Sequence, residues 1–293
     1  MFIATLIAAD RLAQGEISAA QDRFRQAGLG VGEPRWIDHG IACDIPFDGD
    51  LFVARHALEG MIPATDVVVQ SEQGRRKRLL ISDMDSTMIT VECIDELADY
   101  AGLKAEVSEI TERAMRGELD FEAALDARVE LLRGLEAQIL ERCYEERVTL
   151  MPGAVELVQT MRREGALCIL VSGGFTHFAD PVARAIGFDR AVSNVLEVEG
   201  GKLSGSVARP IVGADAKRQV LLDSLAQMGL SADASLAVGD GANDIPMIQA
   251  SGLGVAYHAK PATAAAAAAR IDHCDLAALL YAQGYPRGSW ERG

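Results

Sequence analysis

Positive charge is scarce in this 293-residue sequence, and the shortage argues against one class of partner. Lys and Arg together number 28 against 43 Asp and Glu, so the formal net charge is −15. A chain with this charge repels the backbone of a nucleic acid, so we expect no nucleic-acid partner. A small phosphorylated ligand stays compatible, because a local group of cations with a metal ion outweighs the mean field at short range.

Cysteine pairs and long apolar runs are also missing. None of the five cysteines forms a C-x-x-C pair, which disfavours a zinc site and fits reduced thiols in the cytoplasm. No run approaches the roughly 20 apolar residues that cross a bilayer, so we expect no membrane partner. The apolar residues 1–9 lack a basic segment and a cleavage site, and we interpret them as a strand and not as a signal peptide.

Length and composition allow one large domain and one small domain. Hydrophobic residues make up 49% of the chain and charged residues 24%, which supplies a buried core and argues against disorder. Over residues 1–72 the patterns predict the order βαββαβ, with strands at 2–8, 35–38, 41–45 and 66–70 and helices at 18–27 and 50–60. This order is typical of a ferredoxin-like sandwich. A solvated basic linker is expected at 73–78.

Residues 79–293 are predicted to form an α/β core with a helical insertion. The apolar strand 79–82 is followed by helical patterns that run to residue 147 with no strand among them. From residue 151 on, helices alternate with short apolar strands, the pattern of a parallel sheet covered by helices on both faces (167–171, 235–238, 253–256). We therefore assign 79–91 and 150–293 to the core and 92–149 to a cap.

Three further segments carry simpler predictions. Residues 195–207 contain Gly200 and Gly201 between alternating apolar and polar positions, which predicts a β-hairpin. The alanine run 264–269 predicts a helix, because alanine has the highest helix propensity. Residues beyond Gly284 carry glycine, proline and charge, and we expect this tail to fray.

Acidic residues follow two of the predicted core strands directly. Asp83 and Asp85 come after 79–82, and Asp240 and Asp244 come after 235–238. Ligands bind at the carboxyl ends of parallel strands, and a charge that emerges from a buried strand needs a partner or a metal. Carboxylate and carbonyl oxygens suit Mg²⁺, so we predict a site with Asp83, Asp240 and the backbone carbonyl of Asp85 as ligands.

Two other segments supply groups that bind anions. Ser172, Gly173 and Gly174 end a strand and offer a hydroxyl with backbone amides, and Lys217 lies in the first turn of a predicted helix. Cleavage of a phosphate ester needs a nucleophile, neutralised phosphoryl oxygens and a proton for the leaving alkoxide. Asp83 is the candidate nucleophile and Asp85 the candidate general acid and base. Ser172 and Lys217 are expected to hold the phosphoryl oxygens.

Each of these motifs has an ordinary interpretation when it stands alone. An isolated D-x-D or S-G-G is most often a turn, a first-turn lysine is most often solvated, and Asp244 could simply cap the next helix. The five histidines lack metal-ligand spacing and are interpreted as structural or solvated. Catalysis is favoured because all four motifs occur in order on one chain.

In that order, D-M-D-S-T, S-G-G, the lysine and G-D-G-A-N-D resemble the four motifs of the haloacid dehalogenase superfamily, over roughly residues 79–283. The resemblance implies a Rossmann-like core with a helical C1-type cap and one Mg²⁺ per active site. It implies that Asp83, Asp85 and Asp240 bind the metal, with Asp244 supporting them. The second aspartate, Asp85, marks the phosphatase branch of the superfamily.

Longer segments resemble the phosphoserine phosphatases. They are V-E-C-I-D-E-L, the cap sequence I-T-E-R-A-M-R-G-E-L-D-F-E-A-A-L-D-A-R-V, and G-D-G-A-N-D-I-P-M. The resemblance implies that Glu92 binds the amino group of serine and Arg128 its carboxylate, with Met115 and Phe121 shielding the site. Ser172, Gly173, Lys217 and Asn243 are the other implied substrate contacts. Independently, Phe121, Leu125 and Arg128 are spaced to share one helical face.

The resulting hypothesis is hydrolysis of O-phospho-L-serine to L-serine and phosphate through an aspartyl phosphate, the last step of serine biosynthesis. One alternative keeps the chemistry and changes the substrate to phosphohomoserine or phosphothreonine. Another is a non-catalytic amino-acid sensor, against which the intact acids argue.

Residues 1–72 resemble ACT-type ligand-sensing domains by element order and position. This resemblance leaves open an amino-acid effector in that domain. A homodimer is also left open.

Overall fold

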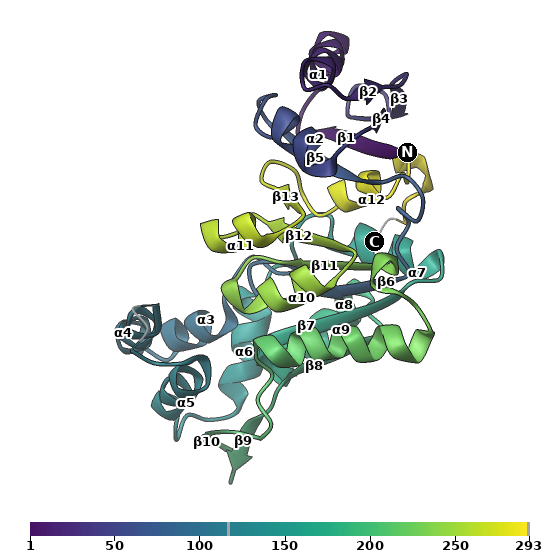
Figure 1. Ribbon diagram of the computed structural model, residues 1–293. Coiled ribbons are helices and arrows are strands. Elements are labelled where there is room, and N and C mark those ends of the chain that lie inside the picture. The colour runs from purple at the N-terminus through teal and green to yellow at the C-terminus, as the bar shows by residue number, and fades with distance from the viewer. Residues whose placement is uncertain (116–117, 292–293) are drawn as a thin grey trace.

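The N-terminal part of the chain forms an antiparallel sheet with helices on one side. The structure is a computed structural model that describes residues 1–115 and 118–291 (Figure 1). The sheet has the order β2-β4-β1-β5, with β3 also paired to β4. If β2 and β3 are counted as one edge, this is the strand order of a ferredoxin-like fold. The elements are β1 (Phe2–Ala8), α1 (Gln14–Gln26), β2 (Gly30–Val31), β3 (Arg35–Asp38), β4 (Ala42–Asp48), α2 (Leu51–Leu58) and β5 (Thr65–Ser71).

Both faces of this sheet are covered, which explains why β1, β4 and β5 are almost wholly buried. Leu6 and Ile45 pack in one apolar cluster with Phe24 of α1. Ile7 and Val68 face the other way and join the apolar cluster of the following core. Alternate residues of a strand point to opposite faces, so the N-terminal sheet lies between its own helices and the core.

Charged side chains join the N-terminal sheet to the core. Arg75 forms an ion pair with the buried Asp44 at 2.5 Å, and the two side chains are 13% and 6% exposed. The carboxylate of Asp66 accepts backbone N–H groups of residues 272–274. The prediction of a solvated linker at 73–78 is therefore wrong for Arg75 and also for Lys77, which is 9% exposed. A buried carboxylate needs a cation, and Arg75 supplies it.

The core is a parallel sheet in the order β13-β12-β11-β6-β7-β8. Its faces are covered by different helices, because Leu80 packs with α7 and α8 while Leu79 and Ile81 pack with α9 and α10. The predicted α/β core is confirmed. Its strands are β6 (Leu79–Ser82), β7 (Leu167–Phe175), β8 (Arg190–Asn194), β11 (Ser235–Gly239), β12 (Leu253–Tyr257) and β13 (Ala269–Ile271). Its helices are α7 (Ala154–Arg163), α8 (Thr176–Ile186), α9 (Ala214–Met228), α10 (Ile245–Ala250), α11 (Pro261–Ala266) and α12 (Ala278–Ala282), with short 3-10 turns at Ala232–Ala234, Ala242–Asp244 and Arg287–Ser289.

The cap lies beyond the sheet, away from the N-terminal helices (Figure 1). It consists of α3 (Cys93–Tyr100), α4 (Lys104–Met115), α5 (Phe121–Leu131) and α6 (Gln138–Arg147). The predicted hairpin is present as β9 (Leu196–Glu199) and β10 (Lys202–Val207), and it lies against the cap, where Gly134 N–H donates to the carbonyl of Leu203. The division of the chain into domains at the predicted boundaries stays a prediction.

Two predictions for the C-terminal part are wrong. The helix in the alanine run ends at Ala266, and Ala269 begins β13. The carbonyl of Ala267 accepts a hydrogen bond from Arg55 of α2 at 2.5 Å, so a contact with the N-terminal part of the chain overrides the helix propensity of alanine. The tail does not fray up to residue 291. Trp290 donates its indole N–H to the carbonyl of Tyr285, which is 3% exposed.

No helix within residues 1–115 and 118–291 is long and apolar enough to cross a membrane.

Candidate active site

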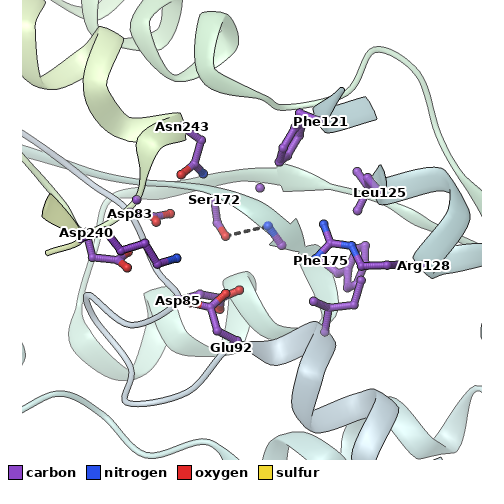
Figure 2. Close-up of a pocket in the computed structure, with 15 residues that line it drawn as sticks. Asp83, Asp85, Glu92, Phe121, Leu125, Arg128, Ser172, Phe175, Asp240 and Asn243 are labelled. Carbon is purple, nitrogen blue, oxygen red and sulfur yellow. Dashed lines mark hydrogen bonds between the residues drawn. The ribbon is translucent and has the colours of Figure 1, made fainter. Parts of the chain in front are cut away.

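The carboxyl ends of β6, β7 and β11 meet at one cavity of about 110 Å³. Figure 2 shows side chains from these strand ends on one side of it and cap side chains on the other. The cavity brings together most of the residues that the sequence predicted. Lining it are Asp83, Asp85, Glu92, Phe121, Arg128, Ser172, Gly173, Asp240 and Asn243, together with Ile94, Leu125, Gly174, Phe175, Gly241 and Lys260.

Three carboxylates form a compact acidic cluster at the core side of this cavity. One oxygen from each of Asp83, Asp240 and Asp244 lies within 4.8 Å of the others, and all three residues are buried. Hard oxygen donors of this kind fit Mg²⁺. Asp244, which was expected to support the metal site, contributes a carboxylate oxygen to this cluster, and the carboxylate of Asp85 does not belong to it. The predicted ligand atom of Asp85 was its backbone carbonyl, and this role stays a prediction.

Lys217 contacts the acidic cluster but is not among the residues that line the cavity. Its ammonium nitrogen is 2.6 Å from Asp83 Oδ1 and 2.7 Å from Asp244 Oδ1, and its side chain is fully buried. Burial lowers the pKa of Lys217, but the carboxylates of Asp244 and Asp83 outweigh burial and raise it. The lysine therefore stays charged and orients both carboxylates.

The carboxyl groups of the site are held at raised pKa values. Burial first and the charge of Asp244 second raise the pKa of Asp83, against the opposing effect of Lys217. Burial and the charge of Glu92 raise the pKa of Asp85 to about 7 and that of Asp240 to about 6. In addition, Asp85 Oδ1 is buried with no hydrogen-bond partner in the described residues. A surplus of buried negative charge with an unsatisfied oxygen is what a bound cation would relieve.

The irregular end of β7, residues 172–174 and here named the anion loop, lies next to Asp85 and offers groups that can hold an anion. Ser172 is 1% exposed, and its Oγ accepts a hydrogen bond from Gly174 N–H at 2.9 Å. A Cβ at Gly174 would lie 3.1 Å from Ser172 Oγ and 3.3 Å from Asp85 Oδ2. Glycine at this position therefore allows the backbone to approach Asp85 closely.

Glu92 and Arg128 face the cavity from the cap. Ser86 donates its hydroxyl to Glu92 Oε1 at 2.7 Å, which ties the carboxylate to the loop that carries Asp85. Arg128 donates from Nε to the carbonyl of Ala124, and burial lowers its pKa against the opposing charges of Asp95 and Glu92. The cap therefore offers one anion beside Asp85 and one cation across the cavity from the acidic cluster (Figure 2).

Phe121 closes the cavity from α5. Its ring lies against Gly173 and Gly213, since a Cβ at either glycine would come within 3.2 to 3.3 Å of a ring carbon. Phe121 itself is 36% exposed. The side chain of Met115, the other predicted shielding residue, lies outside the part of the chain that the structure describes.

Sequence reasoning missed two polar residues in or next to this site. Lys260 lines the cavity, and it follows β12 as the acids follow β6 and β11, so its position after a strand could have identified it. Asn194 ends β8 and hydrogen-bonds to Gly173, a contact that no local pattern in the sequence announces.

The fold and this cavity define a class of protein. Residues 80–249 match the haloacid dehalogenase-like hydrolases, and the chain belongs to that family. Among its relatives are phosphoserine phosphatases. The enzyme of Albidiferax ferrireducens is 46% identical over 208 residues, which cover 69% of this chain and 88% of the relative. The enzyme of Haemophilus influenzae is 46% identical over 202 residues, but the match spans only 64% of its length.

Solved structures resemble the chain over nearly its full length. The unliganded probable phosphoserine phosphatase from Vibrio cholerae has a TM-score of 0.78 at 35% identity, covering 98% of this chain and 87% of that one. A HAD family hydrolase from Salmonella enterica serovar Typhi has a TM-score of 0.85 at 26% identity, covering 96% and 98%. Because the coverage is this high, the likeness includes the N-terminal sheet as well as the core.

Proposed function

We propose that this chain hydrolyses O-phospho-L-serine to L-serine and inorganic phosphate, the last step of L-serine biosynthesis. One observation carries the proposal. Asp83 and Asp85 share a single small cavity with Glu92 and Arg128 of the cap. The acids suit cleavage of a phosphate ester, and the cap pair suits a zwitterion. The names of the relatives support the same substrate.

In the first step, an oxygen of the Asp83 carboxylate attacks phosphorus. The bond between phosphorus and the serine oxygen breaks, and Asp85 donates its proton to that oxygen. In the second step, Asp85 takes a proton from water, the water oxygen attacks phosphorus, and the bond to Asp83 breaks to release phosphate. In the site without a metal ion, burial and the charge of Glu92 raise the pKa of Asp85 to about 7, which favours a proton on this carboxyl group before the first step.

The residues of the acidic cluster would hold one Mg²⁺. Asp83, Asp240 and the backbone carbonyl of Asp85 are the proposed ligands, and Asp244 supports the cluster through Lys217. When bound, the ion supplies positive charge to the phosphoryl oxygens. Ser172 and the amides of its loop face the same oxygens.

Recognition of serine is assigned to the cap. Glu92 is proposed to bind the ammonium group and Arg128 the carboxylate, while Phe121 excludes water above the reacting atoms. Asn243 and Gly173 also line the cavity and are the remaining proposed contacts with the substrate. A related substrate such as phosphothreonine or phosphohomoserine would use the same groups, so the choice among these is a question of rates.

Purified protein with Mg²⁺ should release phosphate from phosphoserine faster than from phosphothreonine, phosphohomoserine or sugar phosphates. Asp83→Asn should abolish release, because an amide cannot serve as the nucleophile. Chelation with EDTA should also stop the reaction, and added Mg²⁺ should restore it. Full activity in Asp83→Asn, or indifference to EDTA, would defeat the proposed mechanism.

Three properties of the whole protein stay predictions. The five cysteines are free, which fits the cytoplasm as the proposed location. An ACT-like role for the N-terminal sheet, with an amino-acid effector, can be tested by calorimetric titration of the full chain with L-serine. A homodimer can be tested by sedimentation.

A further inference from the structure

Asn194 is a buried amide at the end of β8 that uses most of its hydrogen-bonding capacity. It is 1% exposed. Its Nδ2 donates to the carbonyl of Gly173 at 2.8 Å and to that of Val212 at 3.3 Å, and its Oδ1 accepts Val212 N–H at 2.7 Å. A primary amide has two N–H donors, and both are directed at backbone carbonyls. Such a side chain fixes the segments that it joins.

The first segment is the anion loop. The carbonyl of Gly173 and the N–H of Gly174 belong to one peptide unit, which is planar. Asn194 holds the carbonyl end of this unit, and Ser172 Oγ holds the N–H end at 2.9 Å. Both flanking residues are glycines, so the unit would rotate at little steric cost without these two contacts.

The orientation of this peptide unit determines the direction in which the Ser172 hydroxyl can donate a hydrogen bond. Ser172 Oγ accepts the Gly174 N–H, and its hydroxyl hydrogen has no acceptor among the described residues, so it can be donated to a ligand. If the peptide unit rotated, the serine oxygen would lose its donor partner and its orientation. Asn194 does not line the cavity and acts only through the peptide unit.

The second segment carries the surface under Phe121. Val212 precedes Gly213, and the Phe121 ring lies against both Gly213 and Gly173. Asn194 therefore fixes the spacing between the two glycines on which the cap residue packs. The anion loop and the contact surface of the cap are joined by one side chain.

We propose that Asn194 is a positioning residue for the phosphoryl group: it fixes the Gly173–Gly174 peptide unit so that Ser172 donates its hydroxyl to a phosphoryl oxygen. The inference deepens the proposed phosphatase function and rests on it for the identity of the substrate. The binding of a tetrahedral oxyanion by this loop can be measured separately with inorganic phosphate.

The test compares three variants with the unmodified protein. Asn194→Ala removes all contacts. Asn194→Asp keeps the volume and the acceptor for Val212 N–H, but it turns a carboxylate toward two carbonyls. We expect both to lower kcat/KM for phosphoserine at least tenfold and to weaken binding of inorganic phosphate, with Mg²⁺ present, by a similar factor. Asn194→Ser retains one donor and should recover part of the loss.

Gln283→Ala is the matched control. Gln283 is also a fully buried amide, and it hydrogen-bonds with Lys77 N–H and the carbonyl of Leu279 at the junction with the N-terminal sheet. This variant should lower the melting temperature as Asn194→Ala does, yet leave kcat/KM and phosphate binding within twofold of the unmodified values.

The Mg²⁺ concentration for half-maximal activity should change less than twofold in Asn194→Ser.

Three outcomes would overturn the proposal. They are an Asn194→Asp variant with unchanged phosphate binding, a Gln283→Ala variant with the same kinetic loss as Asn194→Ala, and an Asn194→Ser variant no better than Asn194→Ala. If the alanine variant does not fold, Asn194→Ser and Asn194→Asp still decide the matter. If the unmodified protein fails to hydrolyse phosphoserine, the proposed function fails, while the comparison of phosphate binding still tests the role of Asn194.

Discussion

The ammonium nitrogen of Lys217 lies 2.6 Å from Asp83 Oδ1, although the two residues are 134 positions apart in the chain. The same nitrogen lies 2.7 Å from Asp244 Oδ1. The carboxylate proposed as nucleophile is thus oriented by a cation that also holds a member of the acidic cluster. Lys217 was expected to hold phosphoryl oxygens, and the structure gives it these two carboxylates as partners.

Replacing Lys217 with methionine should therefore damage both stability and activity. Two buried carboxylates would lose their cation, a change that costs about 3 to 5 kcal/mol in comparable buried pairs. For a chain of this size we expect the melting temperature to fall by on the order of 10 °C and phosphate release to fall at least a hundredfold. Lys202→Met is the control, because Lys202 is 55% exposed and pairs only with an exposed glutamate among the described residues. Equal effects of the two variants would contradict this account.

Gly239→Ala should displace Asp244. A Cβ at Gly239 would lie 2.4 Å from Asp244 Cγ, and a small adjustment of the Asp244 side chain cannot relieve so close a contact. Asp244 would then leave Lys217 and the N–H of Gly241, to which it also bonds. We expect a higher Mg²⁺ requirement and a slower turnover, measured as phosphate release across a Mg²⁺ titration.

Gly15→Ala is the control for that substitution. Gly15 lies in α1, and a Cβ there would meet no atom within 4 Å. Alanine in a helix is favoured over glycine by up to about 1 kcal/mol, so this variant should be as stable as the unmodified protein or more so. An unchanged Mg²⁺ titration in Gly239→Ala would mean that Asp244 does not shape the metal site.

The parallel sheet and its acidic edge were predictable because their signals are local. Residues 79–82 form an uninterrupted apolar strand that Asp83 follows at once, and β11 with Asp240 repeats the arrangement. The geometry of parallel sheets then places the two acids at one edge. The helical spacing of Phe121 and Arg128 is local too, and both residues line the cavity as expected.

Contacts between distant segments were not predictable in this way. Arg75 pairs with Asp44, and Arg55 reaches the carbonyl of Ala267 across 212 positions. No local sequence pattern indicates either of these contacts. The linker was therefore expected to be solvated, and the alanine run was expected to be helical throughout. Asn194 belongs to the same class, because its partners Gly173 and Val212 lie 21 and 18 positions away.

The raised pKa values predict how the metal-free protein responds to pH. The pKa of Asp85 rises from 3.8 to about 7 and that of Asp240 from 3.8 to about 6, through burial and then the charge of Glu92. The folded state binds these protons more tightly than the unfolded chain does. The resulting stabilisation is present at low pH and is lost as the pH rises from about 4 to about 7.

In EDTA, the melting temperature should therefore fall between about pH 5 and about pH 7.5, and Mg²⁺ should restore it at the higher pH, because the ion binds the ionised carboxylates. The comparison of interest is with Asp85→Asn. That variant should show a shallower decline. If its profile has the same slope as that of the unmodified protein, Asp85 does not carry the raised pKa.

Arg128→Ala separates recognition of the amino acid from the chemistry. Removing a charged hydrogen-bond donor to a carboxylate costs about 1.5 to 3 kcal/mol, so kcat/KM for phosphoserine should fall roughly 10- to 150-fold. Phosphoethanolamine has the same phosphate and ammonium groups without the carboxylate, and its kcat/KM should change less than threefold. Arg133→Ala is the control on the neighbouring turn, since Arg133 is 57% exposed and pairs with the exposed Glu130. Equal losses for phosphoserine and phosphoethanolamine in Arg128→Ala would show that Arg128 does not bind the substrate carboxylate and only supports the structure of the cap.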